Sequence, residues 1–133
     1  LLGAYRKVKE LREQGRLGDV KFVVNMDMIG YNSNGKVDLE TEPEFESVVD
    51  WMAEQVFLYT DLEPVKVLNA WGSDHVPFIK AGVDTLLTIE HWNTHTPCWH
   101  KACDKLDTIN FDYAAQIAKL NIAAISKKAT LVH

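Results

Sequence analysis

Residues 21–29 have the sequence KFVVNMDMI, a short, almost wholly apolar run rich in β-branched side chains. Runs of this composition form strands that are buried on both faces of α/β sheets. Apolar runs at 65–68 and 84–89 predict two further strands, and 37–39 is a possible fourth. Segments with helical periodicity separate these runs. Strands that alternate with helices predict a layered α/β fold with a largely parallel sheet.

Four segments carry helical signals. Residues 1–17 have apolar side chains at three-residue spacing, and a short helix is expected from Ser73, as its N-cap, to Gly82. A longer helix is expected to begin at a capping box formed by Thr41 and Glu44. The apolar stripe of this longer helix consists of Phe45, Val48, Val49, Met52 and Val56.

The fourth helix closes the chain. It is predicted to begin at Thr108 or Asn110, after a long polar loop at 91–107 that contains three of the five histidines. Its core face is expected to consist of Ala115, Ala118, Ile122 and Ile125.

The composition bounds the class of protein. The 133 residues are 47% hydrophobic, which suffices for one sizeable core but not for two ordinary domains. Fourteen Lys and Arg against nineteen Asp and Glu give a formal net charge of -5, whereas proteins that bind nucleic acid or anionic membranes generally present a basic surface. The longest apolar run is far below the roughly 18 residues of a membrane-spanning helix. We therefore expect neither a nucleic-acid nor a membrane partner.

Acidic residues are concentrated in the middle of the chain. Between Val37 and Val65 there are nine of them and no Lys or Arg. Such a run is typical of a solvated acidic face, and an acidic docking surface is the alternative.

Asp27 lies near the end of the strand predicted at 21–29. An unpaired carboxylate buried on both faces would be costly, so Asp27 must be paired, hydrogen-bonded or metal-bound. In open α/β sheets, ligands bind beyond the carboxyl ends of the strands, and Asp27 is at such an end. An Asp that caps the following turn is the purely structural alternative.

The loop at 98–104, CWHKACD, is denser in reactive groups than any other stretch. Cys98, His100 and Cys103 are three potential zinc ligands, one fewer than a closed structural site needs, and their spacing fits no common zinc finger. A disulfide between the cysteines is more plausible, because a turn can bring their Cα atoms within range, and free buried thiols are the alternative. His100 is either a satisfied loop histidine or a metal ligand that Asp104 orients.

Gly72-Ser73-Asp74-His75 lies at a predicted strand-to-helix turn. Helix capping by Ser73 and Asp74 is enough to explain both residues. A role for Asp74 or His75 beside a functional site is the other possibility.

Three stretches taken together resemble one protein family: NMDMIGY at 25–31, GSDHVPFIKAGV at 72–83 and PCWHKACDKLDTIN at 97–110. In order and spacing they are similar to the C-terminal half of the co-catalytic zinc aminopeptidases, the secreted bacterial leucyl-type exopeptidases and their relatives. The resemblance spans most of the chain, from residue 1 to about 125. It implies a three-layer αβα fold with a mostly parallel sheet, of which residues 1–133 form a C-terminal portion of a single catalytic domain.

The resemblance also implies a set of site residues. By position, Asp27 binds one zinc ion and His100 binds the other of a two-zinc site. The bracketing cysteine pair of the family, where present, is a disulfide, which matches Cys98 and Cys103. The residues expected to support the ligands or to line the substrate pocket are Asp74, His75, Trp99 and Asp104, with Trp71, Phe78 and Trp92 around the first side chain of the substrate.

The implied reaction is metal-assisted hydrolysis of the N-terminal bond of peptides with a free N-terminus. In the family, the adjacent Glu-Glu pair that includes the general base directly precedes a Gly-Leu-Leu-Gly type segment. Because this chain opens with Leu1-Leu2-Gly3-Ala4, we expect that pair and the other ligands upstream of Leu1. The 133 residues alone are then expected to have no aminopeptidase activity, to bind zinc weakly and to associate through exposed apolar edges.

Trp99 departs from the bacterial aminopeptidases that have Tyr before the zinc-binding His. Trp at this position is characteristic of the related glutaminyl cyclases, which use one zinc to close N-terminal glutamine into pyroglutamate. Those cyclases usually have Asp-Asp-His in place of Ser73-Asp74-His75 and usually lack the cysteine pair. The peptidase is therefore favoured, and the cyclase and a non-catalytic α/β binding module are the alternatives. The cysteine pair favours an oxidising compartment, so a periplasmic or secreted location is expected.

Overall fold

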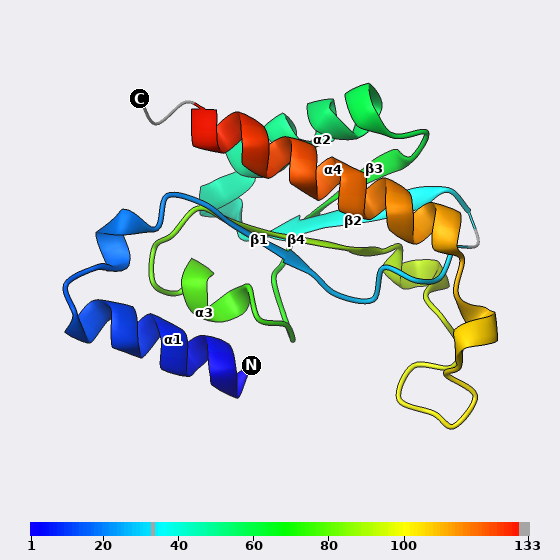
Figure 1. Cartoon of the computed structure of the whole chain (residues 1–133), viewed down its shortest axis with the longest axis horizontal. Coiled ribbons are helices and arrows are strands. Elements are labelled where there is room, and N and C mark those ends of the chain that lie inside the picture. The colour runs from blue at the N-terminus through cyan, green and yellow to red at the C-terminus, as the bar shows by residue number, and fades with distance from the viewer. Residues whose placement is uncertain (33, 131–133) are drawn as a thin grey trace.

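The strands of the computed structural model, which describes residues 1–32 and 34–130, are β1 (Val23–Met26), β2 (Lys36–Thr41), β3 (Glu63–Leu68) and β4 (Thr85–Glu90). Its helices are α1 (Leu2–Glu13), α2 (Glu46–Tyr59), α3 (Val76–Ile79) and α4 (Phe111–Thr130). The strands form one sheet of order β1-β4-β2-β3. Helices α1 and α3 lie on one face of the sheet and α2 and α4 on the other (Figure 1). The three-layer α/β fold predicted from the sequence is confirmed.

The sheet is mixed, with two parallel pairings out of three. β1 runs parallel to β4, with Asn25 opposite Leu87, and β2 runs parallel to β3, with Leu39 opposite Lys66. β2 and β4 are antiparallel. The sheet is therefore mostly parallel, as expected.

β1 does not have the environment that its sequence predicted. It is the outermost strand, its first three residues are half-buried, and Met26 is 48% exposed. Among the described residues, no strand pairs with its outer edge. The expectation of burial on both faces was wrong because an apolar run predicts a strand but does not define its place in the sheet.

The main core lies between the sheet and the layer formed by α2 and α4. The predicted stripe of α2 is confirmed, since Val48, Val49, Met52 and Val56 are buried and Phe45 packs at the margin. The sheet contributes residues from β2 and β4. The remaining buried members are Val37, Leu39, Leu62, Leu86, Tyr113, Ile117, Leu120 and Ala124.

α4 begins where predicted but turns a different face to the core. The Asn110 side chain caps it by accepting the Tyr113 N–H at 3.0 Å. The buried stripe is Tyr113, Ile117, Leu120 and Ala124, whereas Ile122 is 66% and Ile125 51% exposed. Both sets have helical spacing, and the set with the larger Tyr and Leu side chains fills the space over the sheet. Neither α4, the longest helix, nor any other helix of the described residues is long and apolar enough to span a membrane.

Two predicted helix caps were also wrong. Thr41 is the last residue of β2, and its hydroxyl donates to the Thr85 carbonyl at 2.7 Å. A 3₁₀ turn, Pro43–Phe45, leads into α2 without a side-chain cap. Ser73 does not cap α3, because its hydroxyl donates to a carboxylate of another segment. Thr41 and Ser73 therefore each form a hydrogen bond with a distant segment in place of the predicted bond to the helix backbone.

Candidate functional site

Asp27 and His100 line the same pocket, a cavity of about 150 Å³ beside the loop that leads into α3. Both residues are exposed. The fold therefore brings together the two residues that the sequence singled out as metal ligands. The other lining residues are Met28, Glu40, Trp71, Gly72, Ser73, Leu87, Ile89, Trp92 and Trp99.

Asp27 is positioned by β1 and by Ser73. It directly follows β1, and its N–H donates to the Thr88 carbonyl at 3.3 Å. Its Oδ2 accepts the Ser73 hydroxyl at 2.6 Å, and that hydroxyl oxygen accepts Asn25 Nδ2–H at 2.8 Å. Asn25 and Asp27 are two residues apart and so point to the same side of the strand. The chain from Asn25 through Ser73 to Asp27 fixes the orientation of the carboxylate.

His100 is positioned by the cysteine-bracketed turn. Cys98 and Cys103 form a disulfide with a Cα–Cα distance of 5.2 Å. The His100 ring stacks on the Trp99 indole, with ring centroids 4.4 Å apart. His100 and Met28, the two described non-glycine residues with positive φ (56° and 47°), both line the pocket. Left-handed backbone at a bulky residue is strained, and such strain is concentrated at functional sites.

The other residues predicted to support the ligands differ in burial: one is buried and two are exposed. His75 is fully buried and hydrogen-bonded to Glu40, which lines the pocket. Asp74 is exposed. Asp104 is exposed, and its N–H donates to the Lys101 carbonyl at 3.0 Å.

Three tryptophans, Trp71, Trp92 and Trp99, contribute to the apolar wall of the pocket. Trp92 lies at the centre of the cluster, with Trp71 and Trp99 edge-on to it at centroid distances of 5.2 and 5.6 Å. The His95 ring stacks on Trp92, with ring centroids 4.3 Å apart, and lies edge-on to Trp99 at 6.2 Å. Phe78, which was expected beside Trp71 and Trp92, lies in α3 and is not among the lining residues.

Two carboxylates on β2 belong to the site region but were not predicted from the sequence. Asp38 and Glu40 are only 3% and 6% exposed, so the interpretation of this acidic segment as a solvated face does not apply to them. Asp38 accepts the Trp92 N–H at 2.9 Å and binds His91 Nδ1 at 2.6 Å. Glu40 Oε1 accepts the Trp71 N–H at 2.9 Å. The alternation V-D-L-E in the sequence was the available signal, because it places both carboxylates on one side of a strand.

Glu90, at the end of β4, holds two loops of the site region together. Its carboxylate accepts the Tyr31 N–H at 2.9 Å and the Thr96 N–H at 2.8 Å. Tyr31 belongs to the segment that follows Asp27, and Thr96 belongs to the loop that carries His100. Burial raises the pKa of Glu90, and the two N–H donors oppose that increase.

The side chains of the pocket supply some, but not all, of the ligands that a zinc site requires. Carboxylate and imidazole groups are both zinc ligands, and zinc sites generally use at least three protein ligands. Within residues 1–32 and 34–130, no group of three or more His, Cys, Asp or Glu side chains is arranged to hold a metal ion. Asp27 and His100 can therefore supply two ligands but cannot complete a site by themselves.

The sequence profile of peptidase family M28 matches residues 1–125. Among solved structures, the chain is similar to the LapA aminopeptidase of Legionella pneumophila (TM-score 0.79, 23% identity, 91% of this chain and 33% of that chain). It is also similar to BSAP, a zinc aminopeptidase from Bacillus subtilis (TM-score 0.76, 24% identity, 96% of this chain and 32% of that chain). The chain thus spans about a third of the length of these structures. No curated protein sequence matches it.

Proposed function

Because this chain belongs to peptidase family M28, we propose that residues 1–133 form the C-terminal portion of the catalytic domain of a zinc aminopeptidase. The observation that carries the proposal is the common pocket of Asp27 and His100. Further support comes from the similarity to solved aminopeptidases, one of them described as a zinc enzyme. The substrates proposed are peptides with a free N-terminus.

Asp27 and His100 are proposed to hold zinc, one residue for each ion of a two-zinc site. When bound, zinc supplies Lewis acidity that polarises the scissile carbonyl. Ser73 fixes the Asp27 carboxylate through its hydroxyl, and the stacked Trp99 ring restricts the His100 imidazole. Asp104 is proposed to orient His100, and Asp74 and His75 to support the pocket.

The indoles of the pocket are proposed to hold the first side chain of the substrate and to exclude water from the reacting bond. Trp71, Trp92 and Trp99 line the cavity next to both proposed ligands. A water-poor site strengthens electrostatic interactions with the reacting groups. The remaining ligands and the general base are proposed to come from residues outside these 133.

Substitution of the proposed ligands in the full-length protein tests this function. We expect Asp27→Asn and His100→Ala each to lower zinc affinity by more than the roughly 10- to 100-fold that loss of a ligand's hydrogen-bond partner costs. Zinc content after dialysis and hydrolysis of leucine p-nitroanilide are the measurements. Asp61→Asn, which removes a carboxylate on an exposed residue outside the pocket, is the control. Variants that keep both zinc and activity would contradict the proposal.

The 133-residue chain alone is proposed to be inactive and to bind zinc weakly, since it supplies only two matched ligands. Measurable hydrolysis of leucine p-nitroanilide by this chain would show that the general base has been misplaced.

Glutaminyl-peptide cyclisation is the second candidate, favoured by Trp99, whose ring stacks on His100 at the pocket. Parallel assays of the full-length protein on a Gln-initiated and a Leu-initiated peptide separate the two activities. Release of pyroglutamyl peptide without hydrolysis of the Leu peptide would replace the peptidase assignment. Absence of both activities in the zinc-loaded protein would favour a non-catalytic binding module.

A periplasmic or secreted location is proposed from the disulfide between Cys98 and Cys103. Disulfides persist in oxidising compartments and are rare in the reducing cytosol. Association of the 133-residue chain with itself is also proposed, because the free edge of β1 carries neither Pro nor a charged residue.

A further inference from the structure

The apolar pocket beside Asp27 also contains a carboxylate that the proposed reaction does not use. Glu40 projects from β2 into the lining, where its neighbours include Leu87, Ile89 and the indole of Trp71. The residue is only 6% exposed. A buried carboxylate in an apolar wall is costly unless its oxygens have partners.

Both hydrogen bonds of the Glu40 side chain involve the same oxygen. Oε1 accepts the Trp71 N–H at 2.9 Å and lies 3.0 Å from His75 Nε2. In the neutral tautomer with its proton on Nε2, His75 donates to Glu40, and its Nδ1 has no partner in the described part of the chain. Oε2 also has no hydrogen-bond partner among the described residues. Glu40 therefore has one acceptor atom left for a group that enters the pocket.

The size and wall of the pocket define the kind of group that fits. A cavity of about 150 Å³ is well below the roughly 300–1,000 Å³ of pockets that enclose drug-sized ligands, so it suits a single side chain. An apolar stem can lie along the indoles while a cationic tip reaches the carboxylate. Indole faces themselves attract cations. A purely aliphatic side chain would cover Oε2 without giving it a hydrogen bond.

We propose that Glu40 is a specificity-determining residue that selects peptides whose first residue is Lys or Arg. The inference rests on the proposed aminopeptidase function, whose first-residue pocket it assigns to basic side chains. The ammonium or guanidinium group donates to Glu40 Oε2, and Trp71, Trp92 and Trp99 surround the stem.

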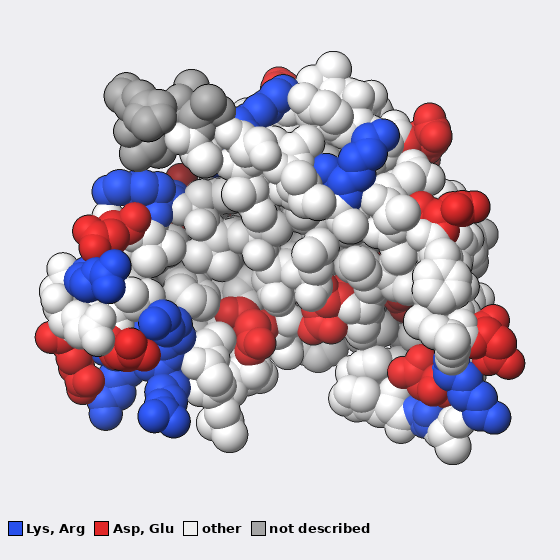
Figure 2. Space-filling model, viewed as in Figure 1, with Lys and Arg blue, Asp and Glu red and all other residues white. Residues whose placement is uncertain are grey.

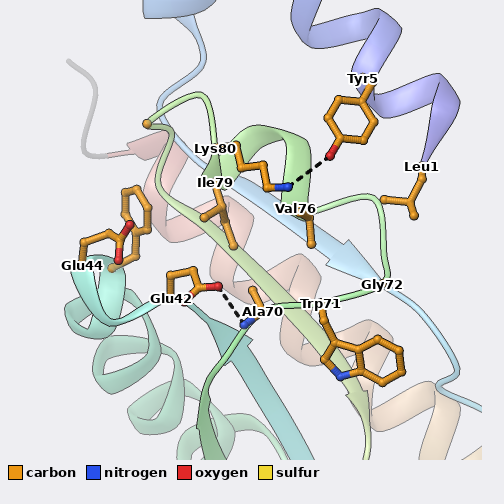
Figure 3. A pocket seen from close by; sticks show the side chains of 12 residues that line it. Leu1, Tyr5, Glu42, Glu44, Ala70, Trp71, Gly72, Val76, Ile79 and Lys80 are labelled. Carbon is orange, nitrogen blue, oxygen red and sulfur yellow. Dashed lines mark hydrogen bonds between the residues drawn. The ribbon is translucent and has the colours of Figure 1, made fainter.

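The Glu40→Gln variant tests the proposed contact with the substrate side chain separately from the hydrogen bonds that Glu40 makes within the protein. The amide oxygen of Gln can accept both bonds that Oε1 accepts, so the Trp71 loop and His75 keep their partner. The amide nitrogen then replaces the free oxygen with a donor, which repels a cation. Glu42→Gln is the matched control, because Glu42 Oε1 likewise accepts a loop N–H, from Ala70 at 3.2 Å, but lines a neighbouring pocket (Figure 3).

The kinetic test compares lysine and norleucine p-nitroanilides with the zinc-loaded, full-length protein, since the two side chains share a stem and differ in the charged tip. We expect kcat/KM to favour lysine by about 10-fold or more, the value of one charge-assisted hydrogen bond. Glu40→Gln should remove this preference, while Glu42→Gln keeps it. Equal or faster hydrolysis of norleucine by the wild type, or a preference that survives Glu40→Gln, overturns the inference while the peptidase function stands.

A binding test separates this inference from catalysis. Lysinamide and norleucinamide are titrated into the zinc-free full-length protein, and the indole N–H signals of Trp71, Trp92 and Trp99 are followed by NMR. Lysinamide should shift these signals at about 10-fold lower concentration than norleucinamide in the wild type and the Glu42→Gln variant, but not in the Glu40→Gln variant. This result supports the pocket assignment even if no substrate is hydrolysed, in which case only the proposed function fails. Equal binding of the two amides overturns the assignment.

Discussion

Ser73 connects two other residues of the pocket region, Asn25 and Asp27, through one hydroxyl group. It donates to Asp27 and accepts from Asn25, and it is 8% exposed. Hydrogen-bond partners of metal ligands orient the ligand and tune its affinity. Because Ser73 lies in the loop before α3, its hydrogen bonds link the layer of α1 and α3 to the end of β1.

Replacement of Ser73 by Ala should lower zinc affinity of the full-length protein by about 10- to 100-fold, because Asp27 loses its partner. Competition with a zinc chelator measures the affinity. Ser47→Ala, on an exposed residue of α2, is the control and should have no effect. Unchanged affinity in the Ser73 variant would mean that the hydroxyl does not act on a metal ligand.

Glu90 gives a residue-scale prediction about pH. Burial raises its pKa above the ordinary value of 4.5, so the folded protein binds its proton more tightly than the unfolded protein. The stability that it contributes is then fully present below pH 4.5 and declines as the pH rises through the folded-state pKa.

Urea denaturation of the wild type and Glu90→Gln across a pH series measures this effect. We expect the free energy of unfolding of the wild type, minus that of the variant, to decrease as the pH rises above about 4.5 and then to level off. Glu54→Gln removes a carboxyl group from an exposed residue of α2 and serves as the control. A difference that does not change with pH would contradict the prediction for Glu90.

Among the elements, α4 shows how packing selects one face of a helix. Ile117 is fully buried against the sheet layer, whereas Ile122 is 66% exposed. The Tyr113 hydroxyl at the start of the helix donates to the Lys36 carbonyl at 2.6 Å, which fixes the rotation of the helix over β2.

Ile117→Ala should destabilise the chain by about 2–5 kcal/mol, because it leaves a cavity in the core. Ile122→Ala, the same chemical change on the exposed side of α4, should change the free energy of unfolding by about 0.5 kcal/mol or less. Thermal or chemical denaturation of the two variants checks this. Equal effects would indicate that α4 presents a different face to the sheet.

At the scale of the whole molecule, the two edges of the sheet differ in chemistry. The β3 edge carries Pro64 and Lys66, which oppose pairing with another strand. The β1 edge has the sequence VVNM and lies beside exposed Ile125 of α4. Figure 2 shows an uncharged area over the middle of the face formed by α4 and β1, with acidic groups just below it and the other charged side chains mainly towards the margins. This face is therefore the one expected to associate.

We expect the 133-residue chain to associate in a concentration-dependent manner, as sedimentation velocity can measure. Met26→Lys places a charge on the β1 edge, where Met26 is 48% exposed, and should reduce association. Phe57→Lys removes a more exposed apolar side chain from α2 and should have little effect. Equal loss of association in both variants would assign it to general surface hydrophobicity.

The sequence by itself determined most of the elements and indicated the two proposed ligands. The strands at 21–29 and 84–89, the stripe of α2 and the cap at Asn110 follow from local patterns, because periodicity and capping act over a few residues. Asp27 and His100 were candidates because of a strand end and a cysteine-bracketed loop, and the family resemblance made them the proposed ligands.

Only the tertiary structure decided which of these residues meet. It placed β1 at the edge, turned Ile122 outward, and directed Ser73 to Asp27 and Glu40 into the pocket. Each of these outcomes depends on contacts between segments far apart in the chain. Burial and hydrogen-bond partners are properties of the packed layers, so no local pattern could have determined them.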